Sequence, residues 1–301
     1  MSKVIGIDLG GTKVTGAVID EQGQVLRQLW QATANSHREA LLQQLTAMVE
    51  QLRTGFEIAA LGIGTPGLVD PVTGEVLLAT NLPGWSQTAV KAELEQRTGL
   101  ATCVANDANA AALGEAWLGA GRNRSCFAML TLGTGVGGAI FDQQSGLWTG
   151  AKHRAAEFGH SILYPAGLPC ACGQRGCADQ YLSGQAVSQA YRRMTGRSIT
   201  CERVFDRAAQ GEATASLVIE NFARDLAIFL INLQNALDPE AVVIAGGLLQ
   251  ACHTWAVLLD KHLSQQSMSA ISVRWVPAIL GAMAGLIGAG RLALQVVGQD
   301  V

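Results

Sequence analysis

The sequence predicts an α/β fold with a duplicated α/β domain, and three observations lead to this prediction. Short apolar runs of strand length alternate with helix-like segments along the chain. With 49% hydrophobic and 15% charged residues in a chain of 301, there is enough apolar material for a large core. The segments 4–20 and 126–142 share one order of strand, glycine-rich turn and strand. Such a weak internal repeat is typical of a duplicated domain.

Strands are expected where short apolar runs are bounded by glycine or by polar turn residues. The first two flank the tetrapeptide GGTK, and the run IAALGIG at 58–64 is apolar throughout, as in a buried strand. The expected strands cover 4–9, 14–20, 24–32, 58–64, 102–106, 126–133, 136–142 and 241–247.

Helices are expected where apolar residues recur at every third or fourth position. The first begins at the capping-box pair Ser36 and Glu39 and continues to Leu52. An alanine-rich helix is expected at 107–118, with Asp107 at its start. The remaining helices are expected at 86–97, 185–194, 212–237 and about 281–296.

The repeat and the composition place a domain boundary near residue 118, although no linker rich in proline, glycine or serine marks it. We expect a smaller N-terminal α/β lobe at 1–118. A larger C-terminal α/β lobe, which contains a cysteine cluster, is expected at 119–288. The last segment, about 289–301, is a candidate to return to the first lobe.

Charge and cysteine content narrow the class of protein. The formal net charge is −3 and lysine and arginine form no run, so nucleic-acid binding is not expected. Two uncharged segments, 125–141 and 275–290, are shorter than the roughly 20 residues that cross a bilayer, so we expect no membrane association. The chain opens without a signal peptide, and its seven cysteines are an odd number. Both features indicate a cytoplasmic protein with reduced thiols.

The turn from Asp8 to Lys13 is the first candidate for phosphate binding. Gly10 and Gly11 have no Cβ, so backbone N–H groups can approach an anion closely. Thr12 adds a hydroxyl group and Lys13 a positive charge, while Asp8 could hold Mg²⁺ or its water. The order of glycine and lysine differs from that of a Walker A loop. A plain hairpin turn is the alternative.

A second turn, at 133–138, has the spacing G-x-G-x-x-G. A dinucleotide site needs a helix after this loop, whereas here a strand follows. We therefore expect two hairpin-type loops that grip one polyphosphate from opposite sides. The second loop contributes Gly133, Thr134, Gly135, Gly137 and Gly138, and Gly246 and Gly247 form a third backbone surface, against the adenosine.

The stretch 155–181 contains four side chains of the kind that bind zinc. The spacing His160-x₉-Cys170-x-Cys172-x₄-Cys177 fills a tetrahedral Zn²⁺ site and leaves no position for a reactive water, so the site is structural. Zinc would fix one ring nitrogen of His160 and would help to order Glu157 nearby. The alternative is four unliganded core residues, which the glycines in this short loop disfavour.

Together these motifs resemble the ROK family of sugar kinases. DLGGTK, GTPGLVD, NDANAAALGE, GTGVGG, AEFGH, the cysteine cluster and IAGG follow in that family's order from residue 4 to about 295. The combination of EFGH with CACGQRGC is specific, whereas GGTK alone is not. The resemblance implies the two-lobed actin-like ATPase fold, which is ribonuclease H-like. It also implies ATP with Mg²⁺ as donor and a hexose as acceptor.

The resemblance assigns roles to individual residues. Asp107, at a helix N-terminus that favours an ionised carboxylate, is similar to the family's general base. An ordinary helix cap is the alternative for this residue. The implied sugar-binding residues are Asp107, Asn106, Glu157 and His160, with Gly67 for backbone approach to the ring and Asn81 as a weaker candidate.

Two further positions bear on the sugar. Trp85 could stack on a sugar face, but a place in the core is the favoured interpretation. The family usually has Glu two residues after the last cysteine, where this chain has Asp179. Aspartate keeps the charge and shortens the reach by one methylene group. Recognition of a sugar hydroxyl at Asp179, and with it the choice of substrate, is therefore in question.

The expected function is ATP-dependent phosphorylation of a hexose at the 6-hydroxyl by a cytoplasmic protein, with a homodimer expected from the resemblance. Glucose is the first choice because TNLPGW resembles glucokinase-type members. N-acetylmannosamine or N-acetylglucosamine come next, followed by fructose or mannose. A sugar-responsive transcriptional regulator is an alternative, but no helix-turn-helix precedes the first strand. A non-catalytic sugar-binding protein is the third candidate.

Overall fold

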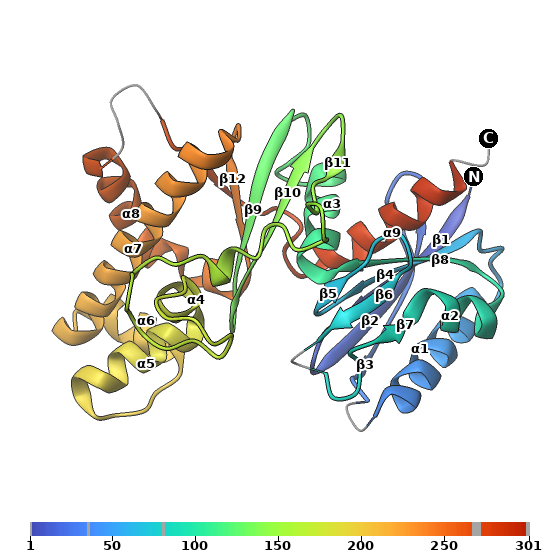
Figure 1. The fold of residues 1–301 in the computed structure, drawn as a ribbon, viewed down its shortest axis with the longest axis horizontal. Helices are drawn as coiled ribbons and strands as arrows, with labels where there is room; N and C mark the ends of the chain where they lie inside the picture. Colours follow the sequence, from blue (N-terminus) through green and yellow to red (C-terminus); the bar gives the residue numbers. More distant parts are fainter. Residues whose placement is uncertain (1, 35–36, 80–81, 267–271, 299–301) are drawn as a thin grey trace. The chain divides into compact units, whose positions relative to one another are not determined.

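The computed structural model describes residues 2–34, 37–79, 82–266 and 272–298, which Figure 1 draws as a ribbon. The chain forms two compact units that share the sequence in an interleaved way. Unit 1 comprises Met1–Arg124, Ile140–Ala155 and Ile279–Val301, and unit 2 comprises Ser125–Ala139 and Ala156–Ala278.

Unit 1 is built on a five-stranded sheet in the order β3-β2-β1-β4-β8. The strands are β1 (Lys3–Leu9), β2 (Lys13–Asp20), β3 (Val25–Ala32), β4 (Ala60–Thr65) and β8 (Ala101–Asn106). The first three form an antiparallel meander, and β4 and β8 run parallel to β1. Parallel strands end at one edge of the sheet, so Asp8 and Asn106 come to the same edge.

Helices cover both faces of this sheet (Figure 1). α1 (Arg38–Arg53) and α2 (Val90–Thr98) share one core with Ile5 and Ile7 of β1. α3 (Asp107–Leu118) and α9 (Ala284–Val297) lie on the other face, where Val4 packs against Leu286. Side chains alternate across a strand, which explains why neighbouring residues of β1 join different cores.

Glycines allow α9 to lie unusually close to its neighbours in unit 1. A Cβ on Gly62 of β4 would overlap the carbonyl oxygen of Ala289, and a Cβ on Gly288 would overlap that of Ala110 in α3. Backbone therefore packs directly on backbone at both contacts. This places the start of α9 beside the ends of β1 and β4.

Short elements complete unit 1. A three-stranded sheet joins β5 (Leu68–Val69), β6 (Glu75–Leu78) and β7 (Thr88–Ala89). The 3₁₀ turn η3 (Gly281–Met283) precedes α9, and β11 (Gly146–Leu147) pairs with the end of β10.

Unit 2 has a core of parallel strands, in the order β9 (Cys126–Leu132), β12 (Val242–Ala245) and β13 (Trp275–Pro277). The strand β10 (Val136–Asp142) flanks β9 and leads to β11. The helices are α4 (Asp179–Leu182), α5 (Gly184–Thr195), α6 (Cys201–Ala209), α7 (Ala213–Leu237) and α8 (Cys252–Gln266), and the 3₁₀ turns are η1 (Phe158–His160) and η2 (Gly247–Ala251). Edge-to-face contacts of Phe222 with Phe205 and Trp255 join α7 to α6 and α8.

The structure confirms the predicted α/β class, and every expected strand is present within two residues of its predicted ends. The helix expected at 86–97 begins only at Val90, because β7 occupies the residues before it. The sequence did not reveal α6, α8 or the small sheet. Ser36 lies outside the described residues, and His37 caps α1 by accepting from the Ala40 N–H at 3.2 Å.

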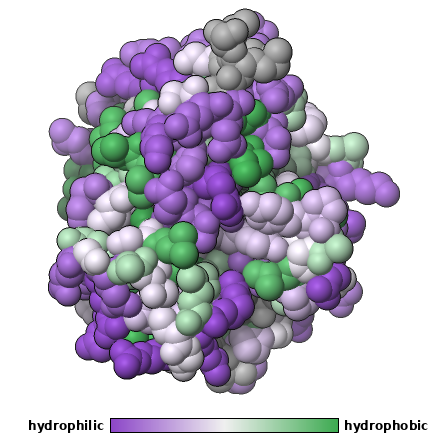
Figure 2. All heavy atoms as spheres, turned by 90° about the vertical axis from the view of Figure 1, so that its left-hand side faces the viewer, coloured by the Kyte–Doolittle hydropathy of each residue, from purple (hydrophilic) through white to green (hydrophobic). Residues whose placement is uncertain are grey.

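The surface of the end of unit 2 that Figure 2 presents is mostly polar, with apolar side chains in small scattered patches. Among the helices of the described ranges, none combines the length and the apolar character that a membrane crossing requires.

Candidate active site

The first glycine turn, in unit 1, is held closed by its own backbone. The Gly10 N–H donates to the Lys13 carbonyl at 2.9 Å, and the Thr33 hydroxyl donates to the Gly10 carbonyl at 2.7 Å. Gly11 and the exposed Thr12 form the tip of the turn. The structure thus gives this turn a fixed shape with exposed polar groups at its end.

Lys13 leaves the turn at the start of β2. Its side chain is exposed, and its ammonium group lies 5.3 Å from the ring centroid of Trp30 on β3. This cation–π contact holds the positive charge next to the turn. The side chain can move from the ring to an anion, because neither group is buried.

The carboxylate of Asp8, at the end of β1, is partly buried in unit 1. Burial raises the pKa of Asp8 to about 6; the negative charge of Asp107 adds to the rise, and Lys13 opposes it. A Cβ on Gly285 would lie 2.9 Å from the carboxyl carbon of Asp8, so α9 begins directly beside this group. A divalent cation would relieve the repulsion between the two carboxylates, so Asp8 fits the expected Mg²⁺ position.

Asn106 and Asp107 stand where β8 passes into α3. The Asn106 Oδ1 accepts from the N–H groups of Ala108 at 2.9 Å and Asn109 at 3.3 Å, which makes Asn106 the N-cap. Asp107 is the first helical residue, and its Oδ1 accepts from the Ala108 N–H at 2.8 Å. The helix therefore already has a capping side chain, so capping does not explain Asp107.

Gly67 follows β4 and contacts the same helix start. The Asn106 Nδ2 donates to the Gly67 carbonyl at 2.9 Å. Gly67 has φ of 104°, and a Cβ there would overlap the carbonyl oxygen of Leu78. Only glycine fits this position, for conformational and steric reasons. The structure thus joins three predicted site residues, Gly67, Asn106 and Asp107, in unit 1.

Trp85 is fully buried, and its Nε1 donates to the Thr65 hydroxyl at 2.9 Å. The favoured interpretation, a core tryptophan, is therefore confirmed. Asn81, the weaker sugar candidate, lies outside the described residues.

The second glycine turn lies between β9 and β10 in unit 2. The Gly133 N–H donates to the Gly135 carbonyl at 3.0 Å, and the Gly137 N–H donates to the Thr131 hydroxyl at 3.1 Å. Gly138 permits close packing, because a Cβ there would overlap the Phe158 ring.

Two N–H groups of this turn stay available. Among the described residues, no backbone or side-chain group accepts from the N–H of Thr134 or of Gly135. Adjacent unpaired N–H groups in a glycine turn are the usual backbone donors to an anion.

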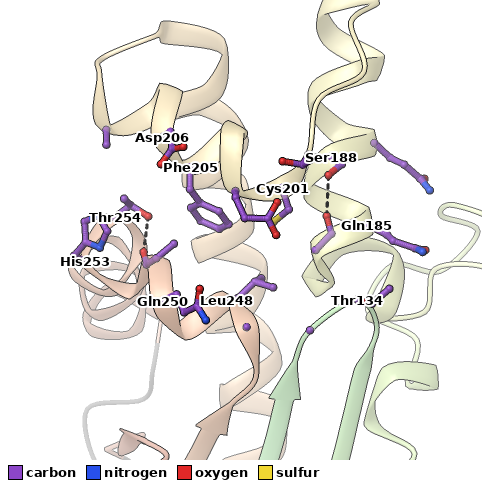
Figure 3. A pocket seen from close by; sticks show the side chains of 18 residues that line it. Thr134, Gln185, Ser188, Cys201, Phe205, Asp206, Leu248, Gln250, His253 and Thr254 are labelled. Atoms are coloured by element: carbon purple, nitrogen blue, oxygen red, sulfur yellow. Dashed lines mark hydrogen bonds between the residues drawn. The ribbon is translucent and has the colours of Figure 1, made fainter. Parts of the chain in front are cut away.

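A cavity of about 1000 Å³ opens beside this turn, entirely within unit 2 (Figure 3). Gly133 and Thr134 line it at the ends of β9 and β10, and Gly247 lines it after β12. Gly246 has φ of 97° and turns the chain so closely past β9 that a Cβ would overlap the Leu132 carbonyl oxygen. The structure therefore brings together two of the three segments predicted to bind the nucleotide.

The other walls of the cavity come from residues that the sequence did not reveal. α5, α6 and η2–α8 contribute Gln185, Cys201, Glu202, Phe205, Asp206 and His253 (Figure 3). α6 starts at the N-cap Thr200, whose hydroxyl accepts from the Arg203 N–H. Burial raises the pKa of Cys201 to about 12, so this thiol stays neutral. Acidic and amide groups line the cavity together with an aromatic ring, and none of its lining residues in the described part of the chain is a lysine or arginine.

The four predicted metal ligands form one cluster in unit 2. The potential ligand atoms of His160, Cys170, Cys172 and Cys177 all lie within 4.8 Å of one another. The Cys172 and Cys177 sulfurs are 3.6 Å apart, and the Cys170 sulfur is 3.8 Å from the His160 Nδ1. A tetrahedral zinc ion with bonds of about 2.3 Å to sulfur requires edges of about 3.8 Å. The cluster therefore fits Zn²⁺.

The thiols of the cluster have shifted pKa values. A hydrogen bond from the Gln174 N–H lowers the pKa of Cys172 to about 6, whereas burial raises the pKa of Cys177 to about 12. Metal binding deprotonates such a buried thiol. Gly173, with φ of 91°, and Gly176, with φ of 79°, form the tight loop between the cysteines.

Glu157 directly precedes the short η1 turn and His160 ends it, three residues further on. Both side chains are exposed, and the His160 N–H donates to the Glu157 carbonyl at 3.0 Å. The ring of His160 turns Nδ1 toward Cys170, which leaves Nε2 on its far side. Ala156, just before the turn, has φ of 62°, which is strained for a residue with a Cβ.

The sequence predicts a sugar ligand at Asp179, whereas the structure places its carboxylate against the second glycine turn. Its Oδ1 accepts from the Val136 N–H at 2.8 Å, and its Oδ2 accepts from Gln180 Nε2 at 3.2 Å. Both contacts lie within unit 2.

Known proteins match this chain along nearly its full length. A sequence model of the ROK family matches residues 4–296. The glucokinase of Streptomyces coelicolor is 35% identical over 318 aligned residues, which cover 98% of each protein. A solved ROK hexokinase from Thermus thermophilus has a TM-score of 0.87 and 30% identity, with 99% of each chain covered.

A second solved structure is a ROK family glucokinase from Streptomyces griseus in complex with glucose and AMPPNP. It has a TM-score of 0.84 and 33% identity, and the match covers 98% of this chain and 100% of that one. These neighbours have the actin-like ATPase fold, which confirms the fold class predicted from the sequence.

Proposed function

Because this chain belongs to the ROK family, we propose that it is an ATP-dependent hexose kinase that phosphorylates the 6-hydroxyl of its substrate, with glucose as first choice. The observation that carries the proposal is the second glycine turn, which opens its unpaired N–H groups beside a cavity of about 1000 Å³. Pockets for small ligands and cofactors have volumes of roughly 300–1,000 Å³. A nucleoside with its phosphates is a ligand of this size.

On the donor side, we assign phosphate binding to the glycine turns predicted from the sequence. The N–H groups of Thr134 and Gly135 donate to phosphate oxygens. The predicted phosphate-binding residues of the first turn are Gly10, Gly11, Thr12 and Lys13. The nucleoside occupies the unit 2 cavity, which Gly247 lines directly after the turn at Gly246, and the ribose hydroxyls pair with acidic and amide side chains. The AMPPNP-bound glucokinase of similar fold supports this assignment.

On the acceptor side, Asp107 accepts the proton of the sugar hydroxyl. The hydroxyl oxygen forms a bond to the γ-phosphorus as the bond to the bridging oxygen of ADP breaks. Asp8 is the residue that would hold Mg²⁺ or its water, and the bound ion would supply charge neutralisation at the transferred group. Lys13 is free to leave Trp30 and to contribute its charge to the phosphates.

The sugar ligands predicted from the sequence stay proposals. In unit 1, Asn106 fixes the Gly67 backbone, and both lie next to Asp107. In unit 2, the exposed side chains of Glu157, just before η1, and of His160, at its end, are the predicted ligands. Asp179 stays a predicted sugar ligand. The metal cluster is structural: it holds His160 and takes no part in the chemistry.

A coupled assay of ADP release tests the proposal. The protein is mixed with ATP and MgCl₂ and with glucose, N-acetylglucosamine, N-acetylmannosamine, mannose or fructose in turn. We expect ADP release that depends on sugar, with the highest kcat/KM for glucose and little release without sugar. A preference for an acetylated sugar would change the substrate but not the reaction. Sugar binding without ADP release would instead indicate the non-catalytic alternative.

The homodimer and the cytoplasmic location stay predictions. Sedimentation of the purified protein at two concentrations measures the first, and a single species of monomer mass would contradict it.

A further inference from the structure

We propose that Asp179 is a positioning residue for the phosphate-binding turn, and that it ties this turn to the metal-binding segment. The inference rests on the proposed function, because it concerns how the nucleotide donor is held. It goes beyond the predicted role of Asp179 as a sugar ligand.

The contact between Asp179 and the turn is direct. Its Oδ1 accepts from the Val136 N–H at 2.8 Å, and a Cβ on Gly135 would lie 3.1 Å from the same oxygen. A hydrogen bond to an ionised carboxylate is stronger than one between neutral groups. The carboxylate therefore fixes the end of the turn where β10 begins.

This bond decides which N–H groups the turn offers to a phosphate. The Val136 N–H is bound to Asp179, and the Gly137 N–H is bound to the Thr131 hydroxyl. Thr134 and Gly135 have no acceptor among the described residues. Asp179 thus binds the N–H group at one end of the turn, and the N–H groups of the two preceding residues remain for the anion.

The position of Asp179 depends on the metal-binding segment. Cys177, a predicted metal ligand, lies two residues before Asp179. It forms an isolated β-bridge with Ile162. Between them, the Ala178 N–H donates to the Ser161 carbonyl at 2.8 Å, next to His160. A metal that joins His160 to Cys177 holds both strands of this bridge, and with them the start of α4.

The length of the aspartate side chain suits this contact. A glutamate would extend the carboxylate by about 1.5 Å, one carbon–carbon bond. The Val136 N–H already lies at hydrogen-bond distance from Oδ1, and a Cβ on Gly135 would lie 3.1 Å from it, so a longer side chain would have to turn away from the loop. With Asp179 in place of the family's usual Glu, the carboxylate therefore binds the glycine turn that is proposed to hold the phosphates of ATP.

The first test compares Asp179→Ala with Asp179→Asn and measures AMPPNP affinity by calorimetry, without turnover. Alanine removes the acceptor, whereas the asparagine oxygen still accepts from Val136. We expect Asp179→Ala to weaken AMPPNP binding about tenfold. We expect Asp179→Asn to keep its AMPPNP affinity within about threefold of the wild type.

A matched control is Asp142→Ala at the other end of β10. Asp142 also accepts from backbone N–H groups, those of Gln144 and Ser145, but lies away from the turn. This variant should keep the AMPPNP affinity of the wild type. Equal loss of glucose affinity in both Asp179 variants, with unchanged AMPPNP binding, would overturn the proposal and leave a sugar ligand.

Hydrogen exchange of the unaltered protein gives a second measurement, which needs no variant and no turnover. Without nucleotide, the Val136 amide should exchange at least tenfold more slowly than the amides of Thr134 and Gly135. Exchange of Val136 as fast as that of Gly135 would overturn the proposal, even in an active kinase. Slow exchange in a protein without kinase activity would instead contradict the proposed function alone.

Discussion

The Asn106 side chain donates from Nδ2 to the Gly67 carbonyl at 2.9 Å while its Oδ1 caps α3. One amide group therefore fixes both the helix that begins with Asp107 and the loop that follows β4. A carboxylate could perform the capping role but not the donation to Gly67.

Asn106→Asp and Asn106→Ala separate these two roles. Aspartate is as good an N-cap as asparagine, so Asn106→Asp should lose less than about 1 kcal/mol of unfolding free energy, whereas Asn106→Ala should lose about 1–2 kcal/mol. Both variants free the Gly67 loop and should raise the KM for sugar at least tenfold. Urea unfolding and steady-state kinetics measure the two effects. A wild-type KM in Asn106→Asp would contradict the role of this bond.

The raised pKa of Asp8 predicts that this carboxylate destabilises the folded protein at neutral pH. The folded state binds the proton more tightly than the unfolded chain, with a pKa of about 6 against 3.8. The stability contribution of Asp8 is therefore greatest below pH 3.8 and is lost as the pH rises through 6. The loss is roughly 2–3 kcal/mol, at about 1.4 kcal/mol per pKa unit.

Asp8→Asn should accordingly unfold at a higher temperature than the wild type at pH 8, measured without Mg²⁺, and should lose phosphoryl transfer. The difference in Tm should shrink as the pH falls toward 4. A Tm of Asp8→Asn equal to or below that of the wild type at pH 8 would mean that the charge is compensated within the fold.

The metal cluster should contain about one zinc ion per chain in protein purified without added metal. Cys172→Ser removes one ligand and should lower both the zinc content and the Tm. The KM for sugar should rise, because His160 is no longer held by the zinc ion. Cys252→Ser is the control, since this cysteine lies outside the cluster. Elemental analysis and thermal unfolding give the result. Full activity in a wild-type protein that contains no zinc would contradict a structural metal.

Glu115 is a buried carboxylate that organises three backbone groups of unit 1. It is fully buried and accepts from the N–H groups of Ala120 at 2.6 Å, Ile279 at 3.2 Å and Leu280 at 2.8 Å. Glu115→Gln puts an NH₂ group against these donors and should lose about 2–3 kcal/mol of unfolding free energy. The exposed Glu50→Gln, which breaks a surface ion pair with Arg53, should lose less than about 1 kcal/mol. If urea unfolding gave the same loss of unfolding free energy for both variants, the stabilising role of the buried Glu115 would be contradicted.

The local parts of the fold and the site were predictable from the sequence. Strands, glycine turns and the cysteine loop are encoded by neighbouring residues, so their patterns identify Gly10, Gly133 and Cys170 directly. The start of α3 was also predictable, although Asn106 and not Asp107 is the cap.

The missing parts depend on contacts between distant segments. Glu202 and His253 line the same cavity, and both α6 and α8 pack against Phe222 of α7. The bond between Val136 and Asp179 joins residues 43 positions apart. An amphipathic helix can be recognised from its periodicity, whereas the partner of its polar face cannot. Asp179 could be singled out from the sequence because the family usually has Glu at this position, but its contact with Val136 could not be predicted.

The most direct measurement of the proposed reaction is a comparison of Asp107→Asn with the wild-type protein. Asparagine preserves the shape of the side chain but cannot accept the hydroxyl proton, so kcat should fall about 10²–10⁴-fold. Calorimetry should show glucose affinity within about threefold of the wild type. A kcat within tenfold of the wild-type value, at full glucose affinity, would contradict Asp107 as the general base of a hexose kinase.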